Sequence, residues 1–291
     1  MMTRLLKLAR SLRKFSVNTI DTALSVTLVQ SDLTWEDCAA NRDNFTSLFQ
    51  GLPDTDLVIL PEMFTTGFSM ASEELSETMD GPTINWMKTQ ASVYNTSICG
   101  SLIIEEENQF YNRFVLVSKD GKIQSYDKKH LFRMSGEHHH YQAGESRLIA
   151  SINGFRICPQ VCYDLRFPAW SRNTEIEKPE SDYLKDTNSG VYDLLIYVAN
   201  WPKSRRLHWL TLLQARAIEN QSYVIGVNRS GIDGNEIQYS GDSGIYDFNG
   251  NCLMDLENNP NIQTYKLQKA PQSKYREDFP AWKDAEGISF Y

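Results

Sequence analysis

The sequence predicts one layered domain of mixed strands and helices, an α+β fold. Apolar runs typical of buried strands alternate along the chain with segments of helical periodicity. Short strands between turn dipeptides dominate the last third of the chain. The 291 residues suit one large domain, and neither a long linker nor an internal repeat divides them. We therefore expect the body of the chain to pack as a single layered unit.

The first half of the chain carries five predicted strands and two predicted helices. Runs rich in apolar and β-branched residues predict strands at residues 23–30, 56–60, 96–104, 110–118 and 123–126. Helical spacing of apolar residues predicts helices at residues 35–48 and 83–94. For the first of these helices we expect Thr34 as the N-cap and Asp37 in the first turn.

The second half continues the alternation. Strands are predicted at residues 155–162, 193–200 and 223–228, and a helix at residues 205–220. Turn dipeptides follow at residues 233–234, 249–250 and 259–260. The segment 173–190 differs, because Glu, Asp, Lys, Asn and Ser dominate it without a sustained period. We expect this insertion to be a mobile surface loop.

The N-terminus is basic and amphipathic. Its first 20 residues contain no acid, and leucines alternate with basic residues at roughly helical spacing. This pattern is typical of a mitochondrial transit peptide, and residues 13–16 resemble a processing site. A disordered basic tail or an upstream start codon is the alternative. We divide the chain into this extension (1–22), a domain (23–270) and a C-terminal tail (271–291), and expect a cytoplasmic or mitochondrial protein.

The charge of the chain excludes one class of partner. Its net charge is −8, and without residues 1–22 the balance falls to −12. Nucleic-acid binding depends on neutralising phosphates with Lys and Arg, so a body this acidic argues against it. No apolar run reaches the roughly 18 residues of a membrane span, so none is predicted.

Cysteine and histidine patterns argue against disulfides and metal. Five cysteines at irregular spacing, without a CxxC pair, favour neither a disulfide framework nor a zinc site. A reducing compartment fits them better. His138, His139 and His140 are adjacent, so their side chains point in different directions. We place them at a pocket rim or on the surface and expect no metal or other cofactor.

Three polar residues stand at the ends of predicted strands, where layered sheets commonly place ligand sites. Glu62 closes DLVILPE, Lys128 follows IQSYD, and Cys162 closes FRICPQVCYD. Each is ordinary by itself, because a loop Glu, a charged turn and an inert core thiol are common. Cys158, four residues before Cys162 on the same strand, is assigned to the core.

The segments around these three residues resemble the signatures of the nitrilase (carbon–nitrogen hydrolase) superfamily. Glu62 lies in LPEMFTTGFS, Lys128 in YDKKHLF and Cys162 in CYDLRFP. Further similar segments are YVANWP, QARAIENQ, YVIGVNR and YSGDSGIYDFNG, so the resemblance runs from about residue 23 to 267. HLFRMSGEHHHYQAG and VANWP are most similar to bacterial omega-amidases that act on 2-oxoglutaramate. The resemblance implies a four-layer αββα sandwich.

The same resemblance implies the catalytic roles. Cys162 is expected to be the nucleophile that forms a thioester, and Glu62 the general base that moves its proton. Lys128 is expected to stabilise the oxyanion, together with the backbone N–H of Tyr163. Glu137, a second glutamate, is expected to orient Lys128 and support substrate placement.

Surrounding residues receive supporting roles. His130 is expected to fix the Lys128 loop, and an ion pair between Asp164 and Arg166 to hold the turn at Cys162. Arg133 is the expected partner of a substrate carboxylate, because Arg presents a planar fork to carboxylates. The remaining pocket-wall candidates are Phe64, Phe68 and Trp201.

The implied function is hydrolysis of the terminal amide of a small dicarboxylate monoamide, such as 2-oxoglutaramate, by a homo-oligomer. A deaminated-glutathione amidase or an N-carbamoyl hydrolase is the alternative within the superfamily. A papain-like hydrolase with His130 or His138 as base is another enzyme class. A non-catalytic binding protein on the same fold is the alternative outside enzymes.

Overall fold

The computed structural model describes residues 22–174 and 191–284. The expected transit peptide and nearly all of the expected insertion lie outside these residues. The first residue of that insertion, Asn173, is buried rather than on the surface. Its side chain accepts hydrogen bonds from the backbone N–H groups of Val191 and Tyr192 and donates to the carbonyl of Tyr192. Asn173 therefore belongs to the core, and the insertion begins after it.

Two six-stranded sheets form the centre of the molecule. The first has the order β14-β1-β2-β3-β4-β5 and the second β13-β12-β9-β8-β7-β6. The first sheet consists of β1 (Ala23–Gln30), β2 (Leu57–Ile59), β3 (Ser97–Glu106), β4 (Gln109–Val117), β5 (Ile123–Asp127) and β14 (Asn261–Gln268). The second consists of β6 (Ala150–Ile152), β7 (Phe155–Val161), β8 (Leu194–Ala199), β9 (Tyr223–Asn228), β12 (Gly244–Tyr246) and β13 (Cys252–Asp255). A separate hairpin pairs β10 (Ser230–Ile232) with β11 (Gln238–Ser240).

The two sheets repeat one topology. Each places three parallel strands in its middle, β1-β2-β3 in the first and β7-β8-β9 in the second. Antiparallel strands flank them on both sides. The central strands β2 and β8 therefore occupy equivalent positions. In parallel sheets of this kind, ligand sites lie beyond the carboxyl ends of the strands.

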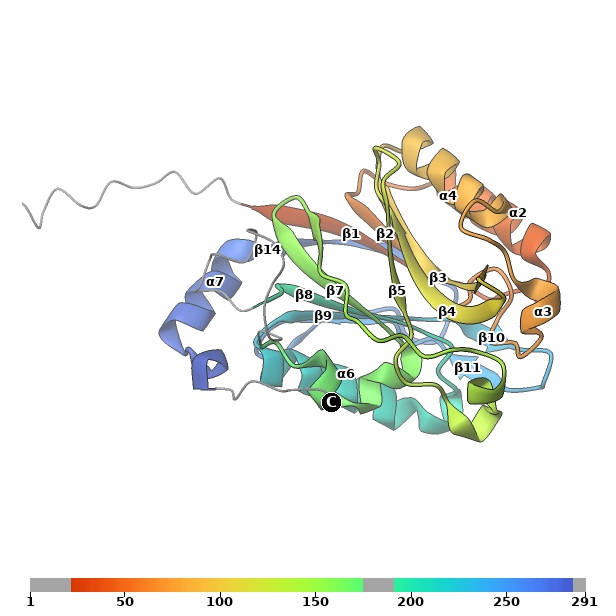
Figure 1. Ribbon diagram of the computed structural model, residues 1–291. Coiled ribbons are helices and arrows are strands. Elements are labelled where there is room, and N and C mark those ends of the chain that lie inside the picture. Colours follow the sequence, from red (N-terminus) through yellow and green to blue (C-terminus); the bar gives the residue numbers. More distant parts are fainter. Residues whose placement is uncertain (1–21, 175–190, 285–291) are drawn as a thin grey trace, which may run out of the picture.

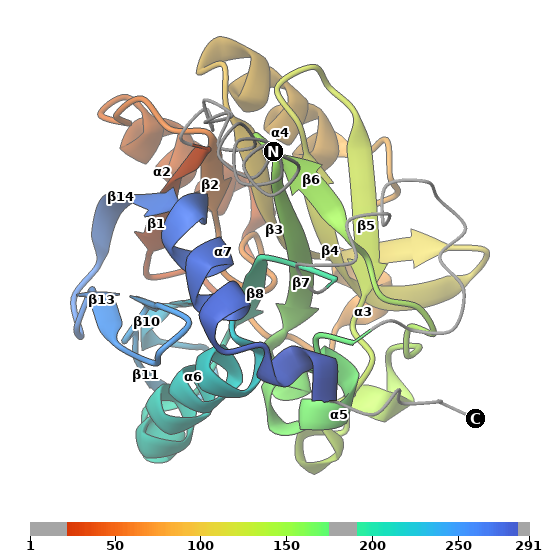
Figure 2. The same cartoon turned by 90° about the vertical axis from the view of Figure 1, so that its left-hand side faces the viewer.

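Helices cover the outer faces of both sheets and give four layers (Figures 1 and 2). Helices α2 (Cys38–Phe49) and α4 (Pro82–Val93) pack on the first sheet, and α6 (Arg206–Asn220) packs on the second. On β2, Leu57 and Ile59 face the opposite sheet, whereas Val58 faces the α2–α4 layer. This alternation buries both faces of the strand. The predicted layered α+β fold is confirmed.

Helix α2 begins later than predicted. Its N-cap is Asp37, whose carboxylate accepts from the Ala40 N–H at 2.9 Å, and not Thr34. Glu36 has a left-handed backbone (φ 56°) and donates its N–H to the carbonyl of Thr66. Trp35 and Glu36 thus form a turn that a contact distant in sequence stabilises. The periodicity of apolar residues alone could not reveal this contact.

The remaining helices are short or C-terminal. They are α3 (Ser72–Leu75), α5 (Pro168–Ser171), α7 (Lys269–Asp278) and the 3₁₀ turns η1 (Arg133–Ser135), η2 (Glu137–His139), η3 (Cys162–Arg166), η5 (Lys203–Arg205) and η6 (Ala281–Asp284). The predicted domain boundary at residue 270 falls inside α7. Arg276 of this helix is buried and donates to the carbonyl of Tyr192. No helix of residues 22–174 or 191–284 has the length and apolar character to cross a bilayer.

Asp193 connects α7 to the second sheet. Its carboxylate lies 3.1 Å from the guanidinium of Arg156, 3.1 Å from the ammonium of Lys269 and 3.3 Å from the guanidinium of Arg276. Burial raises the pKa of Asp193, but the cations outweigh it and hold the pKa below its usual range. This carboxylate therefore stabilises the folded chain at neutral pH.

We predict that Asp193→Asn lowers the free energy of unfolding at pH 7 by about 3–5 kcal/mol, because the buried Arg276 and the partly buried Arg156 and Lys269 lose their shared partner. The pKa of Asp193 is lower in the folded than in the unfolded chain, so its charge stabilises the fold at pH values above the unfolded pKa of about 3.9. This stabilisation is lost as the pH falls through the pKa of the folded state. The difference between the two proteins should therefore shrink at low pH. Urea unfolding between pH 7 and pH 3 measures it, and a constant difference would contradict this assignment.

Candidate active site

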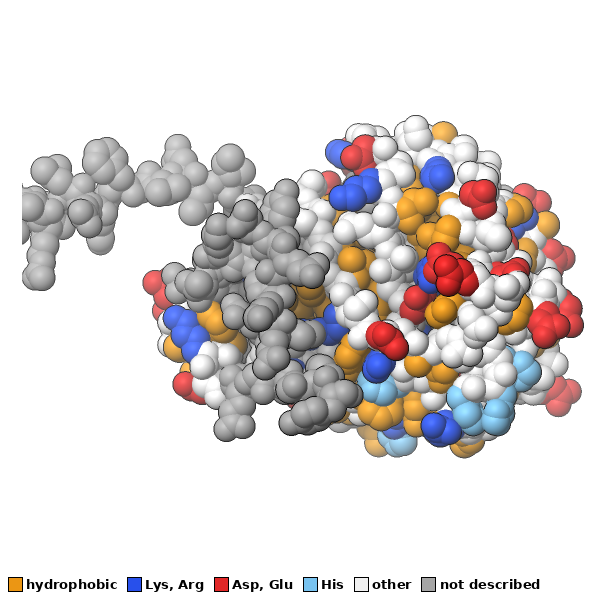
Figure 3. Space-filling model, viewed as in Figure 1, with side chains coloured by type: hydrophobic (Ala, Val, Ile, Leu, Met, Phe, Trp, Pro, Cys, Tyr) orange, Lys and Arg blue, Asp and Glu red, His pale blue; other side chains and the backbone are white. Residues whose placement is uncertain are grey.

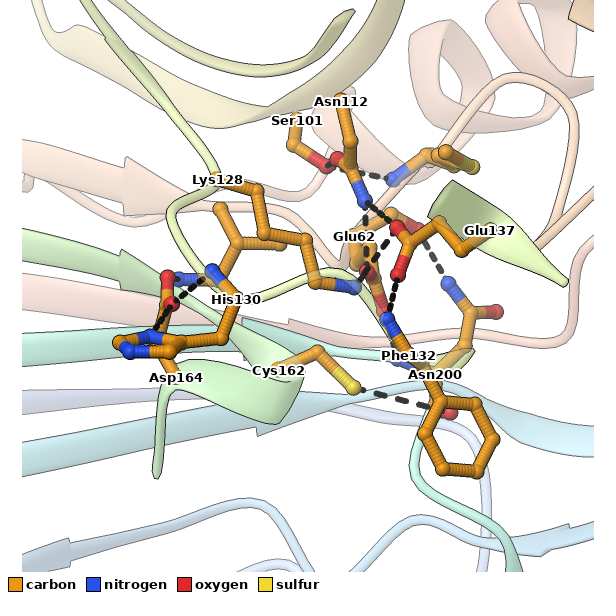
Figure 4. A network of polar contacts seen from close by, with 12 residues as sticks. Glu62, Ser101, Asn112, Lys128, His130, Phe132, Glu137, Cys162, Asp164 and Asn200 are labelled. Atoms are coloured by element: carbon orange, nitrogen blue, oxygen red, sulfur yellow. Dashed lines mark hydrogen bonds and ion pairs between the residues drawn. The ribbon is translucent and has the colours of Figure 1, made fainter. Parts of the chain in front are cut away.

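Three chain segments bring the predicted catalytic side chains together (Figure 4). Glu62 lies just beyond β2, Lys128 directly follows β5, and Cys162 directly follows β7. The first two come from one sheet and the third from the other. Glu62 and Lys128 are fully buried. The site therefore lies between the sheets, beyond the carboxyl ends of their parallel strands.

Two carboxylates share one ammonium. The Lys128 Nζ lies 3.0 Å from Glu62 Oε1 and 2.8 Å from Glu137 Oε1. The other oxygens of the two carboxylates accept backbone N–H groups. Asn200 donates to Glu62 Oε2 at 2.8 Å, and Phe132 donates to Glu137 Oε2 at 2.5 Å. Glu137 is thus placed to orient Lys128.

The electrostatics keep Lys128 charged. Burial disfavours its ammonium, but Glu137 and Glu62 outweigh this and raise the pKa of Lys128 above its usual range. Burial, with the charge of Glu62 acting in the same direction, raises the pKa of Glu137. The two carboxylates therefore favour the ammonium form of Lys128.

Cys162 sits at a sharp turn. Contrary to the predicted strand over 155–162, β7 ends at Val161, and Cys162 starts η3 with a left-handed backbone (φ 44°). Such a conformation costs a non-glycine residue about 1–2 kcal/mol, and functional sites are where it is commonly kept. It turns the thiol away from the strand, toward the carbonyl of Asn200 at 4.0 Å. Cys158 lies in the core, as predicted.

Burial disfavours the thiolate form of Cys162. Burial raises its pKa well above the usual value, and the charge of Glu62 adds to this. Lys128 acts in the opposite direction but does not outweigh burial. Because the thiolate is the nucleophilic form, attack by this sulfur requires a base beside it.

Asp164 ties the Cys162 turn to the Lys128 loop. It accepts from the His130 backbone N–H and contacts His130 Nδ1 at 2.8 Å. It also accepts from Tyr126 Oη at 2.7 Å and from the Val161 N–H at 3.1 Å. The expected ion pair with Arg166 is wrong, because these partners occupy the Asp164 carboxylate. His130 instead has the structural place that was predicted for it.

A cavity of about 310 Å³ opens onto the thiol. Predicted residues in its wall are Tyr163, Trp201 and Phe68, whose ring lies 5.1 Å from Lys128 Nζ. Neither His130 nor His138 lines it, which disfavours a papain-like Cys–His pair.

Two predicted wall residues lie elsewhere. Phe64 is buried in the core beneath α2 and α4, because its N–H bonds to the Ser101 carbonyl and its ring packs on Phe45. Arg133 is exposed on η1 and does not line the cavity.

The cavity carries two other guanidinium groups. Arg205 lies over the ring of Phe132, and Arg166 lies over the rings of Trp201 and Tyr163. Within the part of the chain that the structure describes, neither forms an ion pair with a carboxylate. Arg166 contacts His208 Nδ1 at 3.1 Å, but no acid of the described residues neutralises either guanidinium at this cavity.

Sequence reasoning missed the amides of the site. Asn112 donates to Glu62 Oε1 and Glu137 Oε1, and Asn200 donates its side-chain N–H to the Glu62 carbonyl at 2.6 Å. Each has a signal in the sequence. Asn112 is a polar residue inside the largely apolar segment FYNRFVLV, and Asn200 directly follows the apolar strand LLIYVA.

The histidine run lies at the surface. His139 and His140 are exposed, and histidine side chains gather near one edge of the face shown in Figure 3. No group of three His, Cys, Asp or Glu in residues 22–174 and 191–284 could hold a metal ion.

This chain belongs to the carbon–nitrogen hydrolase family, whose model matches residues 25–276. It is 46% identical over 265 residues to the omega-amidase YafV of Escherichia coli (strain K12), covering 90% of this chain and 97% of that protein. The 2-oxoglutaramate amidase of Bacillus subtilis (strain 168) is 31% identical over 232 residues, covering 79% of this chain and 84% of that protein. The crystal structure of XC1258 from Xanthomonas campestris, a CN-hydrolase superfamily protein with an arsenic adduct in its active site, has a TM-score of 0.86. That chain is 42% identical, with coverage of 92% of this chain and 99% of its own.

The superfamily predicted from the motifs is thereby confirmed, together with its single layered domain. So is the predicted class of enzyme, a hydrolase of carbon–nitrogen bonds in linear amides. A non-catalytic binding protein on this fold is disfavoured.

Proposed function

We propose that this enzyme is an omega-amidase that hydrolyses the terminal amide of a small dicarboxylate monoamide, such as 2-oxoglutaramate, to the dicarboxylate and ammonia. The observation that carries the proposal is the cluster of buried Glu62, buried Lys128 and half-buried Cys162 at a cavity that also carries two guanidinium groups. Within residues 22–174 and 191–284, neither guanidinium forms an ion pair with a carboxylate. The relatives named omega-amidase and 2-oxoglutaramate amidase support the same reaction.

The first half-reaction forms a thioester. Glu62 takes the proton of the Cys162 thiol as the sulfur attacks the amide carbon, and the carbonyl oxygen becomes an oxyanion. The Lys128 ammonium and the backbone N–H of Tyr163 stabilise this oxyanion. The tetrahedral intermediate then collapses: the carbon–nitrogen bond breaks, Glu62 returns the proton to the leaving nitrogen, and ammonia departs.

The second half-reaction releases the acid. Glu62 takes a proton from a water molecule as its oxygen attacks the thioester carbon, and Lys128 again faces the oxyanion. The carbon–sulfur bond breaks, and the sulfur regains a proton from Glu62. Because the pKa of Lys128 is raised, its ammonium does not enter these proton transfers. Glu137 orients it throughout.

The substrate carboxylate is bound by Arg166 and Arg205. Both line the cavity that ends at Cys162, and neither is neutralised by an acid among residues 22–174 and 191–284. A guanidinium presents two parallel donors to a carboxylate. A substrate with an amide at one end and a carboxylate at the other thus matches both ends of the cavity. The predicted homo-oligomer stays a prediction.

We predict that Arg166→Gln and Arg205→Gln each raise KM for 2-oxoglutaramate about tenfold or more, the value of a charge-assisted hydrogen bond. A neutral amide of equal length should lose little, because it lacks the carboxylate. Arg133→Gln is the matched control and should leave both substrates unchanged. Equal losses on charged and neutral amides would contradict carboxylate binding by these residues.

An ammonia-release assay over several amides tests the proposed function. The panel contains 2-oxoglutaramate, 2-oxosuccinamate, deaminated glutathione, an N-carbamoyl amino acid and a neutral amide. We expect the highest kcat/KM with a short dicarboxylate monoamide. A preference for deaminated glutathione or for the N-carbamoyl compound would replace the proposed substrate with that class.

A further inference from the structure

We propose that Asn112 is a positioning residue that holds Glu62 and Glu137 in their places around Lys128. The inference rests on the proposed roles of these three residues. Asn112 is fully buried on β4, and its Nδ2 lies 2.8 Å from Glu62 Oε1 and 3.2 Å from Glu137 Oε1. Its backbone carbonyl accepts the N–H of Lys128 at 3.0 Å. One residue therefore contacts both carboxylates that form ion pairs with the ammonium (Figure 4).

A chain of hydrogen bonds fixes which way the Asn112 amide faces. The N–H of Met63 donates to Ser101 Oγ at 2.9 Å. The Ser101 hydroxyl oxygen thus accepts one hydrogen bond, and its own proton is donated to Asn112 Oδ1 at 2.8 Å. With its oxygen held by Ser101, the amide must present its NH₂ group to the carboxylates. Met63 directly follows Glu62, so this series of hydrogen bonds begins at the backbone of Met63 and ends at the side chain of the neighbouring residue, Glu62.

The amide solves a problem of like charges. Glu62 and Glu137 are both fully buried and face one ammonium, so one negative charge is left over. Two carboxylates in one buried site tend to share a proton unless donors hold both in the charged form. Asn112 supplies two donors without adding a charge. Glu62 can then remain an unprotonated carboxylate. The attack by Cys162 requires this form, because Glu62 must accept the thiol proton.

Each carboxylate oxygen consequently has an assigned donor. The two Oε1 atoms receive Lys128 and Asn112, and the two Oε2 atoms receive backbone N–H groups. The other titratable groups that face this cluster are the Cys162 thiol and the Tyr141 phenol, both with raised pKa values through burial. Neither supplies a charge at neutral pH that could replace the amide.

Asn112→Leu tests the inference, because leucine has a similar size and lacks both the donor and the acceptor. We expect kcat to fall about 100-fold, in line with removal of a catalytic-site hydrogen-bond donor, and KM to change less than about threefold. The acid limb of the pH–rate profile, where the carboxylate pair takes up a proton, should move to higher pH. Ser101→Ala leaves Asn112 free to turn and should produce a smaller loss with the same shift.

Asn41→Leu is the matched control. Asn41 is equally buried and bonds at both ends, to Thr34 and Thr65, away from the carboxylates. It should lower stability without moving the acid limb. The inference is overturned if Asn112→Leu keeps the wild-type profile, or if it loses activity with an unmoved limb, as a merely structural residue would. Should Asn112→Leu fail to fold, an unmoved limb in Ser101→Ala overturns it.

Alkylation of Cys162 by iodoacetamide keeps this test separate from the proposed function. The reaction needs no amide substrate, but it needs Glu62 ionised to accept the thiol proton. The acid limb of the pH profile of the alkylation rate should move to higher pH in Asn112→Leu and in Ser101→Ala. If the wild-type enzyme turned over none of the amides, the proposed function would fail while the alkylation profile still decided the role of Asn112.

Discussion

Replacement of Cys162 by alanine should abolish amide hydrolysis and leave the fold intact. The thioester cannot form without the sulfur, and no other thiol lines the described cavity. Loss of one oxyanion donor already costs about 10²–10³ in rate, so loss of the nucleophile should leave less than about one-thousandth of the wild-type kcat. Ammonia release from 2-oxoglutaramate measures the loss. Alanine removes one atom from a turn that already has a left-handed backbone, so the thermal unfolding midpoint should change little.

Cys158→Ala is the matched control for this prediction. Cys158 is fully buried in the core against the α6 layer, four residues before Cys162. Its replacement should lower the unfolding midpoint while kcat stays near the wild-type value. Substrate should also protect Cys162, but not the exposed Cys252, from alkylation. Residual turnover in Cys162→Ala above one-thousandth would remove the sulfur from its proposed role.

Local sequence patterns predict the bounds of a helix or strand correctly where neighbouring residues alone determine its ends. Strand β9 has the predicted bounds, because an apolar run interrupted only by Gly226 extends from Tyr223 to Val227 and begins three residues after the end of α6. Helix α2 was misplaced because its start depends on Glu36 and Thr66, thirty residues apart. The repeated topology of the sheets leaves no trace in the sequence, since strand order constrains burial but not residue identity.

The proposed catalytic residues stand in recognisable sequence motifs, whereas the residues around them are placed by tertiary packing. Phe64 and Phe68 stand in one motif, yet only Phe68 reaches the cavity. The left-handed backbone of Met63 (φ 42°) and the bond from Phe64 to Ser101 turn the Phe64 ring into the core. Such turns are set by contacts between distant segments.

The same reason explains the misplaced arginine. Arg133 is predicted to bind a carboxylate because of the planar fork of its guanidinium, but η1 places it at the surface. Arg166 and Arg205 reach the cavity because aromatic side chains of three separate segments support their guanidinium groups. No spacing within one segment could indicate this arrangement.

Lys128→Met should lower kcat by about 10²–10³ or more, because a preorganised charge in a dry site then no longer faces the oxyanion. The variant also leaves Glu62 and Glu137 without their shared cation, so one of them should take up a proton and stability should fall. Thermal unfolding must therefore accompany the ammonia assay, with kcat measured well below the new midpoint. Lys128→Arg should also be poor, because a planar guanidinium cannot replace the compact ammonium that lies 3.0 Å from Glu62 and 2.8 Å from Glu137.

Lys129→Met separates this role from that of a general positive patch. Lys129 is one residue away, but it is only half-buried and its ammonium lies 5.3 Å from the centre of the Trp170 ring, away from the carboxylates. We expect kcat to stay near the wild-type value. If both variants lost activity equally, and if high salt removed the difference from wild type, then the two lysines would attract an anionic substrate through solvent. Attraction through solvent fades with ionic strength, whereas a buried ammonium 3.0 Å from Glu62 is shielded from salt. A loss specific to Lys128 that persists at high salt is therefore the result that a fixed oxyanion partner requires.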